Sequence, residues 1–333
     1  MIDQPGDSAK AAVRATVWNI RIDAAAAEAL AALAQEGIDA IVLKGPALSD
    51  WYAGEPPRTY EDADIWVSPQ HLERAGAVLQ RLGYAPKQDE RGLPQWWQEH
   101  AGSWVRESDG VAIDLHRRLQ GARAPAALVW ELLSGEREPL SLGGRPAQRL
   151  GGAARALYVT LHAAHDGDRG TQAVRHLERA LTHVSEAEWR RAAELAEAVD
   201  ARDAFAAGIR LCARGEELAV RLGLPQNSSV EAEIRANIAP PVALGFEQLA
   251  GARAGARIEI LLRKLFPPPG FIRHWWAPAQ RNAALLALGY LYRPLWLARH
   301  APRGYRAWRA AHRTVEAQRR AADPPARSES SSR

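Results

Sequence analysis

Three aspartates are the residues whose type and spacing point most directly to chemistry. Asp62 and Asp64 lie two positions apart at the start of a short apolar segment, and Asp114 lies in another such segment. Side chains alternate across a strand, so Asp62 and Asp64 point to the same side if their segment is a strand. Three carboxylates converge if the strand of Asp114 is a neighbour, and divalent cations relieve their repulsion. Mg²⁺ prefers oxygen ligands shared with substrate phosphates, which indicates two-metal phosphoryl or nucleotidyl transfer.

A short segment upstream is suited to hold the phosphates of such a substrate. We expect a buried strand to end at Lys44, and Gly45 then lets the backbone approach a phosphate before Pro46 begins a helix. The N-terminus of a helix favours an anion. Lys44 is one of only four lysines among 43 basic residues, and its mobile charge suits a triphosphate. Arg58, four residues before Asp62, is a second candidate phosphate ligand.

Each of these features also has a purely structural interpretation. An Asp-x-Asp pair is most often a solvated strand face or a turn, and a turn from a strand through glycine into a helix is common. Asp114 alone also fits a surface carboxylate or a helix cap. The prediction therefore depends on the combination and order of the features.

Apolar runs and chain-breaking residues predict the elements that must position these side chains. Short strands alternate with helices up to about residue 150, and Ser108-Asp109-Gly110 is a hairpin signal. The elements expected there are a helix over 11–35, strands over 39–44 and 63–67, helices over 46–53, 68–83 and 125–133, and hairpins over 104–116 and 140–149.

The second part of the chain differs in composition and in its predicted elements. From Gly151 to about Arg320, helices rich in Ala, Leu, Arg and Glu dominate. The pattern predicts an α+β protein in which a small mixed sheet with flanking helices (residues 1–150) is followed by an all-helical domain (151–322). Residues 323–333 have almost nothing to bury and are predicted to form a disordered tail.

Composition excludes several classes of protein. The chain has 333 residues, 47% hydrophobic and 25% charged, which is typical of a globular protein and excludes collagen-like, fully disordered and disulfide-scaffold proteins. No apolar run is long enough to span a membrane. Cys212 is the single cysteine, so neither an intramolecular disulfide nor a cysteine zinc site is expected. This cysteine usage makes a reducing cytoplasm the expected compartment, and the acids before the first helix do not fit a secretory signal.

Three histidines are candidates for a second site. His162 and His165 are three residues apart on a predicted helix and share a face. They could bind a metal, line the pocket of an acceptor, or pack the helical domain against the sheet. His116 shares a strand face with Asp114, where it could contact substrate or make a structural hydrogen bond.

The C-terminal helix is rich in arginine. Residues 293–320 contain eight Arg and one acid, with Trp296, Tyr305 and Trp308 between them. Arginine with aromatic residues can bind nucleic acid or lie on an anionic membrane. A solvated helix face is the simpler interpretation.

Taken together, the motifs resemble the uncharacterised nucleotidyltransferase family of the DNA polymerase β-type superfamily. The resemblance covers residues 38–119 and consists of a Leu-Lys-Gly turn, an arginine leading into Asp-x-Asp, and a later strand ending in acid-hydrophobic-His. The residues that carry it are Leu43-Lys44-Gly45, Tyr52, Arg58, Asp62, Asp64, Leu82-Gly83-Tyr84 and Asp114-Leu115-His116.

The resemblance assigns roles to these positions. Gly45 matches the turn that cradles nucleotide phosphates, Asp62 and Asp64 match the metal ligands, and Asp114 matches the third acid, a base or ligand near the acceptor hydroxyl. Two residues depart from the wider superfamily: Pro46, which lacks an N–H, follows the glycine, and Glu61 stands where a small residue is common.

The function implied is transfer of a nucleoside monophosphate from an NTP, with Mg²⁺ or Mn²⁺, to a hydroxyl or phosphate of a small-molecule or peptide acceptor. The helical domain would close the cleft and select the acceptor. Two alternatives remain: a nucleotide- or partner-binding module of the same fold without catalysis, and an RNA-modifying nucleotidyltransferase.

Overall fold

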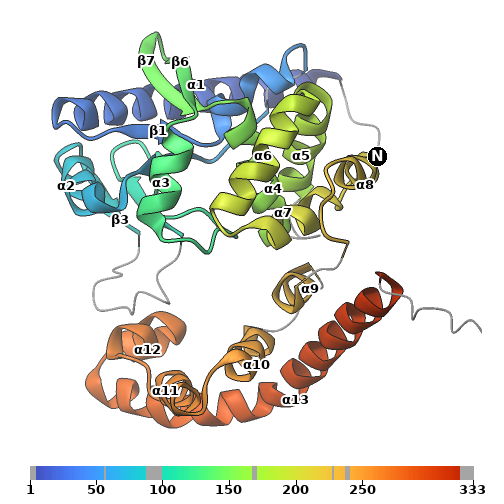
Figure 1. The fold of residues 1–333 in the computed structure, drawn as a ribbon. Coiled ribbons are helices and arrows are strands. Elements are labelled where there is room, and N and C mark those ends of the chain that lie inside the picture. Colours follow the sequence, from blue (N-terminus) through green and yellow to red (C-terminus); the bar gives the residue numbers. More distant parts are fainter. Residues whose placement is uncertain are drawn as a thin grey trace, which may run out of the picture.

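The computed structural model describes residues 5–55, 58–87, 100–166, 171–226, 229–236 and 241–322, and within them one seven-stranded mixed sheet forms the centre (Figure 1). The pairs β2–β5 and β1–β7 are parallel, and the other neighbours are antiparallel. In order across the sheet the strands are β3 (Tyr84–Pro86), β4 (Ala101–Arg106), β5 (Ala112–His116), β2 (Asp62–Val67), β1 (Ala40–Val42), β7 (Arg145–Leu150) and β6 (Arg137–Leu142).

The strand register brings the acids of β2 and β5 side by side. Asp64 on β2 is the register partner of Asp114 on β5, and Asp62 lies two residues earlier on the same face. The intervening residues of β2, Ala63 and Ile65, point to the opposite face and are buried. The alternation of acid and apolar residues in the sequence therefore divides β2 into a polar face and a core face.

Helices cover both faces of the sheet. The long helix α1 (Pro5–Gln35) and α2 (Leu72–Arg81) cover the face of Ile65, where Ile22 and Leu33 join the core. The other face, which carries the acids and Trp66, is covered by helices packed in a second core. These helices are α3 (Ala126–Ser134), α4 (Gly152–Asp166), α5 (Thr171–His183), α6 (Glu186–Ala198), α7 (Arg202–Ile209) and α8 (Ala213–Arg221).

The second core continues across residue 150. It includes Ile41 and Trp66 of the sheet together with Leu157 of α4 and Trp189 of α6. The first helices after residue 150 therefore belong to the same packed body as the sheet, and the domain division at that residue stays a prediction.

The last helices form a separate group, which Figure 1 shows below the sheet and joined to it through α9. Small cores hold it together, one from α9, α10 and α13 and one around Phe271 and Ile272. Its elements are α9 (Val230–Ala236), α10 (Pro241–Gly251), α11 (Ala254–Leu265), α12 (Pro269–Trp275), the 3₁₀ helix η4 (Ala277–Gln280) and α13 (Ala283–Ala322). None of the described helices has the length and apolar character needed to span a bilayer.

The predicted α+β class, with a mixed sheet followed by helices, is confirmed, and most predicted elements are present. The segment after Lys44 is a 3₁₀ helix, η1 (Gly45–Tyr52), and the predicted helix over 68–83 begins as a 3₁₀ turn, η2 (Pro69–His71), before α2. The edge strand β3 was not predicted, because three residues are too few to show a period of two. Residues 323–333 lie outside the described residues.

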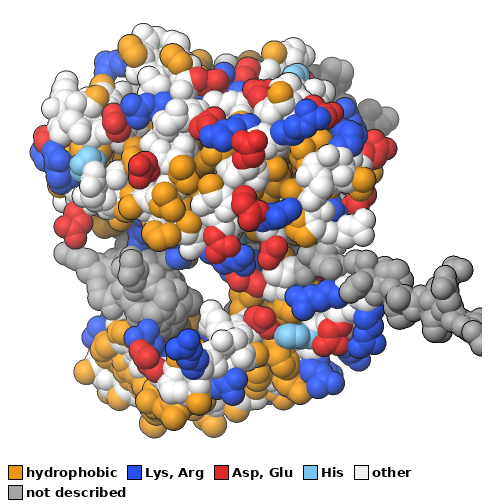
Figure 2. All heavy atoms as spheres, in the orientation of Figure 1, with side chains coloured by type: hydrophobic (Ala, Val, Ile, Leu, Met, Phe, Trp, Pro, Cys, Tyr) orange, Lys and Arg blue, Asp and Glu red, His pale blue; other side chains and the backbone are white. Residues whose placement is uncertain are grey.

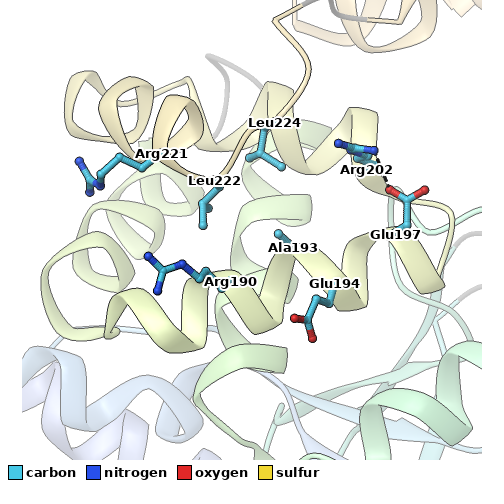
Figure 3. A pocket seen from close by; sticks show the side chains of 8 residues that line it. All are labelled: Arg190, Ala193, Glu194, Glu197, Arg202, Arg221, Leu222 and Leu224. Carbon is cyan, nitrogen blue, oxygen red and sulfur yellow. Dashed lines mark ion pairs between the residues drawn. The ribbon is translucent and has the colours of Figure 1, made fainter.

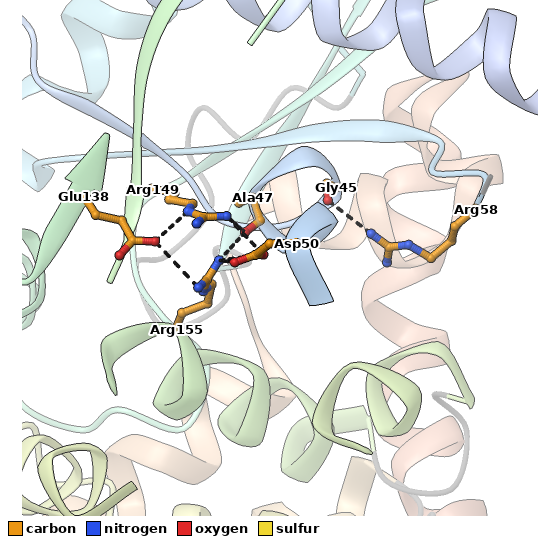
Figure 4. A network of polar contacts seen from close by, with 7 residues as sticks. All are labelled: Gly45, Ala47, Asp50, Arg58, Glu138, Arg149 and Arg155. Atoms are coloured by element: carbon orange, nitrogen blue, oxygen red, sulfur yellow. Dashed lines mark hydrogen bonds and ion pairs between the residues drawn. The ribbon is translucent and has the colours of Figure 1, made fainter. Parts of the chain in front are cut away.

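A network of ion pairs around the buried Arg155 fixes η1 between the sheet and α4 (Figure 4). Arg155 of α4 is 5% exposed and donates to the Ala47 carbonyl at 2.8 Å and to Asp50 at 3.0 Å. Arg149 of β7 reaches the same Ala47 carbonyl at 3.1 Å, and Glu138 of β6 accepts from Arg149 at 2.7 Å. Because η1 directly follows Gly45, the network also holds the glycine turn in place.

We expect Arg155→Met to lower the free energy of unfolding by about 1–3 kcal/mol, because it keeps much of the side-chain volume but removes the buried cation that joins the Ala47 carbonyl, Asp50 and Glu138. Urea denaturation followed by circular dichroism measures the change. Arg191→Met is the matched control: Arg191 is an exposed arginine with ion pairs, and its loss should cost at most about 0.5 kcal/mol. Equal losses in the two variants would contradict the role of the network.

Candidate active site

The polar face of β2 opens into a cavity of about 480 Å³ between the sheet and helices α4 and α5. It gathers charged groups that are far apart in sequence, including four acidic and two basic side chains. The lining residues from the sheet side are Lys44, Gly45, Arg58, Thr59, Tyr60, Glu61, Asp62 and Asp64, and those from the helices are His162, Asp166, Gln172, Ala173 and His176.

Asp64 is the most buried acid of this face, at 3% exposure. One of its oxygens, Oδ1, accepts from Lys44 Nζ at 2.9 Å and from His116 Nε2 at 2.8 Å. Burial alone would raise the pKa of Asp64, but the charge of Lys44 and the hydrogen bond from His116 outweigh it and hold the pKa well below its usual range. Asp64 is therefore ionised at neutral pH, and His116 donates through Nε2.

Lys44 is fixed by the same contact. Burial lowers its pKa, but neighbouring negative groups, Asp64 among them, outweigh burial and raise the pKa above its ordinary value. Lys44 therefore carries a permanent positive charge against the acidic face. In this structure the lysine predicted to contact a triphosphate lies against the carboxylate of Asp64.

The negative charge of Asp62 is less well compensated than that of Asp64. Burial raises its pKa to about 7, and the charges of Asp64 and Asp114 add to the shift. Near neutral pH Asp62 is thus close to half-protonated, because the sheet brings more negative charge together than Lys44 balances.

Asp114 completes the row of acids on the sheet. It lies beside Asp64 on the neighbouring strand and accepts a hydrogen bond from Ser103 Oγ of β4 at 2.7 Å. The three acids share one face as the spacing predicts. Within the described residues, however, no group of three or more His, Cys, Asp or Glu side chains is placed so that it could hold a metal ion.

The turn beside the acids depends on glycine. Gly45 has φ +59, a left-handed conformation that favours glycine, and a Cβ added there would lie 3.4 Å from the Tyr60 ring. Arg58 donates to the Gly45 carbonyl at 3.1 Å (Figure 4) and lies 3.1 Å from His176 Nε2. The other ring nitrogen of His176 is 2.6 Å from the Tyr52 hydroxyl. These contacts hold the Arg58 guanidinium at the mouth of the turn.

The two histidines predicted to share a helix face open onto different cavities. His162 lines the acidic cavity, and His165 lines a second cavity of about 670 Å³ on the far side of α4. Gln120 connects the two sides: its Oε1 accepts from His162 Nδ1 at 3.1 Å, and its Nε2 donates to His100 at 3.0 Å. His116, which donates to Asp64, is next to His100, and the centres of the two rings are 5.3 Å apart.

Sequence reasoning did not select His100 or Gln120 and did not assign His176 to the site. His100 and Gln120 are single polar residues without a motif, and they reach the site only through the packing of α4 on the sheet. His176 follows His162 and His165 on the next helix, and this spacing was the only available signal.

A third cavity, of about 620 Å³, lies among α6, α7 and α8 away from the acids (Figure 3). Arg202 and Glu197 form an ion pair of 3.1 Å there. Its described lining holds no Asp, His, Cys or Lys, and opposite charges already pair within it. The chemistry of the chain therefore concentrates at the acidic cavity.

Comparison with known proteins agrees with this geometry. The sequence model of a family described as "Uncharacterised nucleotidyltransferase" matches residues 8–215, well over half of the chain. The chain belongs to this nucleotidyltransferase family. The protein is thus a transferase. The matched residues include the sheet, the three acids and helices α4 to α7. A comparison with curated proteins finds no match.

Three solved structures show a distant likeness to the nucleotidyltransferase. The solution structure of the antibiotic-resistance factor ANT(2'')-Ia and the crystal structure of ANT(2'')-Ia with adenylyl-2''-tobramycin are each 16% identical, at TM-score 0.37. They cover 52% of this chain and 88% and 94% of their own. An antigenic nucleotidyltransferase-like protein from Paracoccidioides brasiliensis is 13% identical at TM-score 0.37, over 63% of this chain and 94% of that one.

The electrostatics of Asp62 predict a stabilising substitution. Its folded-state pKa lies above the unfolded value, so its contribution to stability falls as pH rises from about 4 to 7 and the full penalty remains above pH 7. Asp62→Asn removes the penalty, and we expect its Tm in EDTA at pH 8 to exceed that of the wild type by about 2–6 °C. At pH 4 the two proteins should melt together.

Differential scanning calorimetry measures this difference, and Glu73→Gln, at an exposed carboxylate of α2 on the other face of the sheet, is the control. A Tm for Asp62→Asn at or below that of the wild type at pH 8 would show that the acidic face is not under electrostatic strain.

Proposed function

We propose that this protein transfers a nucleoside monophosphate from an NTP to a small-molecule or peptide acceptor in a reaction that depends on Mg²⁺ or Mn²⁺. The observation that carries the proposal is the in-register placement of Asp64 and Asp114, with Asp62 on the same face, next to the Gly45 turn. Family membership supports the reaction class.

The donor set on this face fits a hard divalent cation. Asp62 and Asp64 offer carboxylate oxygens, and Asp64 uses only Oδ1 toward Lys44 and His116. Burial, with the charges of Asp64 and Asp114, raises the pKa of Asp62, and a bound cation would offset that shift. When bound, the cation supplies charge neutralisation at the transferring phosphoryl group. Because the described part of the chain forms no closed three-ligand site, substrate phosphates would complete the coordination.

The residues around the acids have separate tasks in this proposal. The Gly45 turn and Arg58 would hold the triphosphate, and Lys44 would keep Asp64 ionised until the substrate arrives. Asp114, oriented by Ser103, would take the proton of an acceptor hydroxyl or act as a further ligand. Catalysis would come mainly from positioning and from charge neutralisation.

The second cavity is our proposed acceptor site. Three arginines and one acid, Glu231, carry its charge, whereas the first cavity has an excess of acids. Burial and then the charges of Arg235 and Arg118 lower the pKa of His165 to about 4. A neutral histidine between two arginines suits an acceptor that carries a carboxylate or phosphate. Gln120 contacts His162 of the first cavity and His100 of the second, so an acceptor bound in the second cavity would have to extend past the Gln120 side chain to bring its hydroxyl to the acids.

The first test asks whether the site turns over. Purified protein is incubated with isotope-labelled NTPs, Mg²⁺ and a cell extract, and mass spectrometry searches for a nucleotide adduct while a coupled assay follows pyrophosphate. We expect Asp64→Asn to reduce turnover by at least about 10³-fold. Glu73→Gln, at an exposed carboxylate of α2 outside the acidic cavity, should retain activity.

The alternatives have different outcomes in the same test. NTP binding by titration calorimetry without turnover on any acceptor would favour a non-catalytic binding module. Full activity of Asp64→Asn would contradict the metal assignment.

The second test concerns the acceptor recovered from that extract. Arg235→Gln should raise its KM about tenfold and leave the KM for the NTP unchanged, because it removes one charge-assisted contact. Arg221→Gln, in the cavity of Figure 3, is the matched control. An acceptor KM unchanged by Arg235→Gln would place the acceptor elsewhere.

A further inference from the structure

Residues 241–322 have a charge balance unlike the rest of the chain. They hold 14 of its 43 Lys and Arg but only 3 of its 39 Asp and Glu. They lie beyond the residues 8–215 that the family matches, and none of them is among the described residues that line the three cavities. The chemistry of the active site therefore does not explain this segment.

The same segment exposes large apolar side chains. Helix α11 has no buried residue, and Leu291 and Leu295 of α13 are 70% and 69% exposed. Figure 2 shows apolar side chains gathered along the outer edge of these C-terminal helices, with basic side chains among them. The large apolar side chains of α11, the residue after it and the first part of α13 that are exposed are Ile258, Leu261, Leu262, Phe266, Leu288, Leu291 and Leu295.

One face of α13 changes from apolar to basic along its length. Residues three or four apart lie on the same side of a helix. At that spacing the exposed residues are Leu288, Leu291, Leu295, Arg299, Arg303 and Arg306. On an anionic membrane, the apolar half of this face can enter the headgroup boundary while the basic half meets the negatively charged headgroups.

We propose that this face of α11 and α13 docks on an anionic phospholipid surface. The leucines would enter the boundary between headgroups and acyl chains, and the arginines would lie against lipid phosphates. Trp275, Tyr292 and Trp296 pack against one another beside the apolar half, where aromatic side chains suit a membrane interface.

Other occupants fit the surface less well. A second copy of this chain would bring basic face against basic face, and the excess of 14 basic over 3 acidic residues would repel it. A nucleic acid would satisfy the arginines but would leave Leu291 and Leu295 in water. An anionic bilayer suits both the apolar half and the basic half of this face of α13. This proposal does not depend on the proposed transfer reaction.

Vesicle sedimentation of the full chain tests the proposal. We expect the protein to pellet with vesicles of 70% phosphatidylcholine and 30% phosphatidylglycerol and to remain in solution with pure phosphatidylcholine. Leu291→Glu/Leu295→Glu should weaken binding at least about tenfold, because two inserted apolar side chains are lost and negative charge is added. Val220→Glu, at another exposed apolar residue, on α8, should bind as the wild type does.

Circular dichroism of the double variant, in which both replaced residues are exposed, provides the control for folding. Failure of the wild type to bind the anionic vesicles would overturn the proposal. So would vesicle binding that Leu291→Glu/Leu295→Glu leaves unchanged, because charge alone would then explain the association. Binding to single-stranded RNA that is tighter than binding to the vesicles, and equal in both proteins, would identify the surface as a nucleic-acid site instead.

Discussion

An ionised aspartate buried among other carboxylates is the constraint on which the active site depends. Removing a charge from water costs several kcal/mol unless partners compensate it, and Asp64 has two partners on a single oxygen, Lys44 and His116. That arrangement compensates Asp64 but not Asp62, whose pKa is raised to about 7 by burial and by the charges of Asp64 and Asp114. The protein thus supplies one cation, Lys44, to a face that carries three carboxylates.

The pairing of the strands brings the partners of Asp64 together. Lys44, Asp64 and His116 come from consecutive segments of the sheet, and the hydrogen bond from the Leu43 N–H to the Asp64 carbonyl brings Lys44 beside the carboxylate. A shift of one residue in any strand would turn the charged side chain into the apolar core on the α1 side. The left-handed Gly45 then directs the chain away from the acids, and the Arg155 network holds it there.

The sequence predicted what depends on local pattern, and it did not predict what depends on packing. The alternation in β2 and the turn signals gave the strands, the hairpins and the shared face of Asp62 and Asp64. The pairing of Lys44 with Asp64 was not foreseen, because nothing in a strand-glycine-helix motif says whether its lysine faces solvent or an acid on the next strand. His162 and His165 have helical spacing, yet α4 forms a wall between two cavities and separates them.

The distribution of charge along the chain constrains how a nucleotide enters. Once residues 241–322 are set apart, the remainder has 29 basic and 36 acidic residues, so the part that contains the active site is net negative. A free triphosphate would be repelled by such a surface, and Lys44, already paired with Asp64, offers little compensation. A triphosphate that arrives with a divalent cation carries less negative charge, and that cation would offset the charge of Asp62. If the proposed transfer reaction is correct, this charge balance favours the metal–nucleotide complex over the free nucleotide as the entering species.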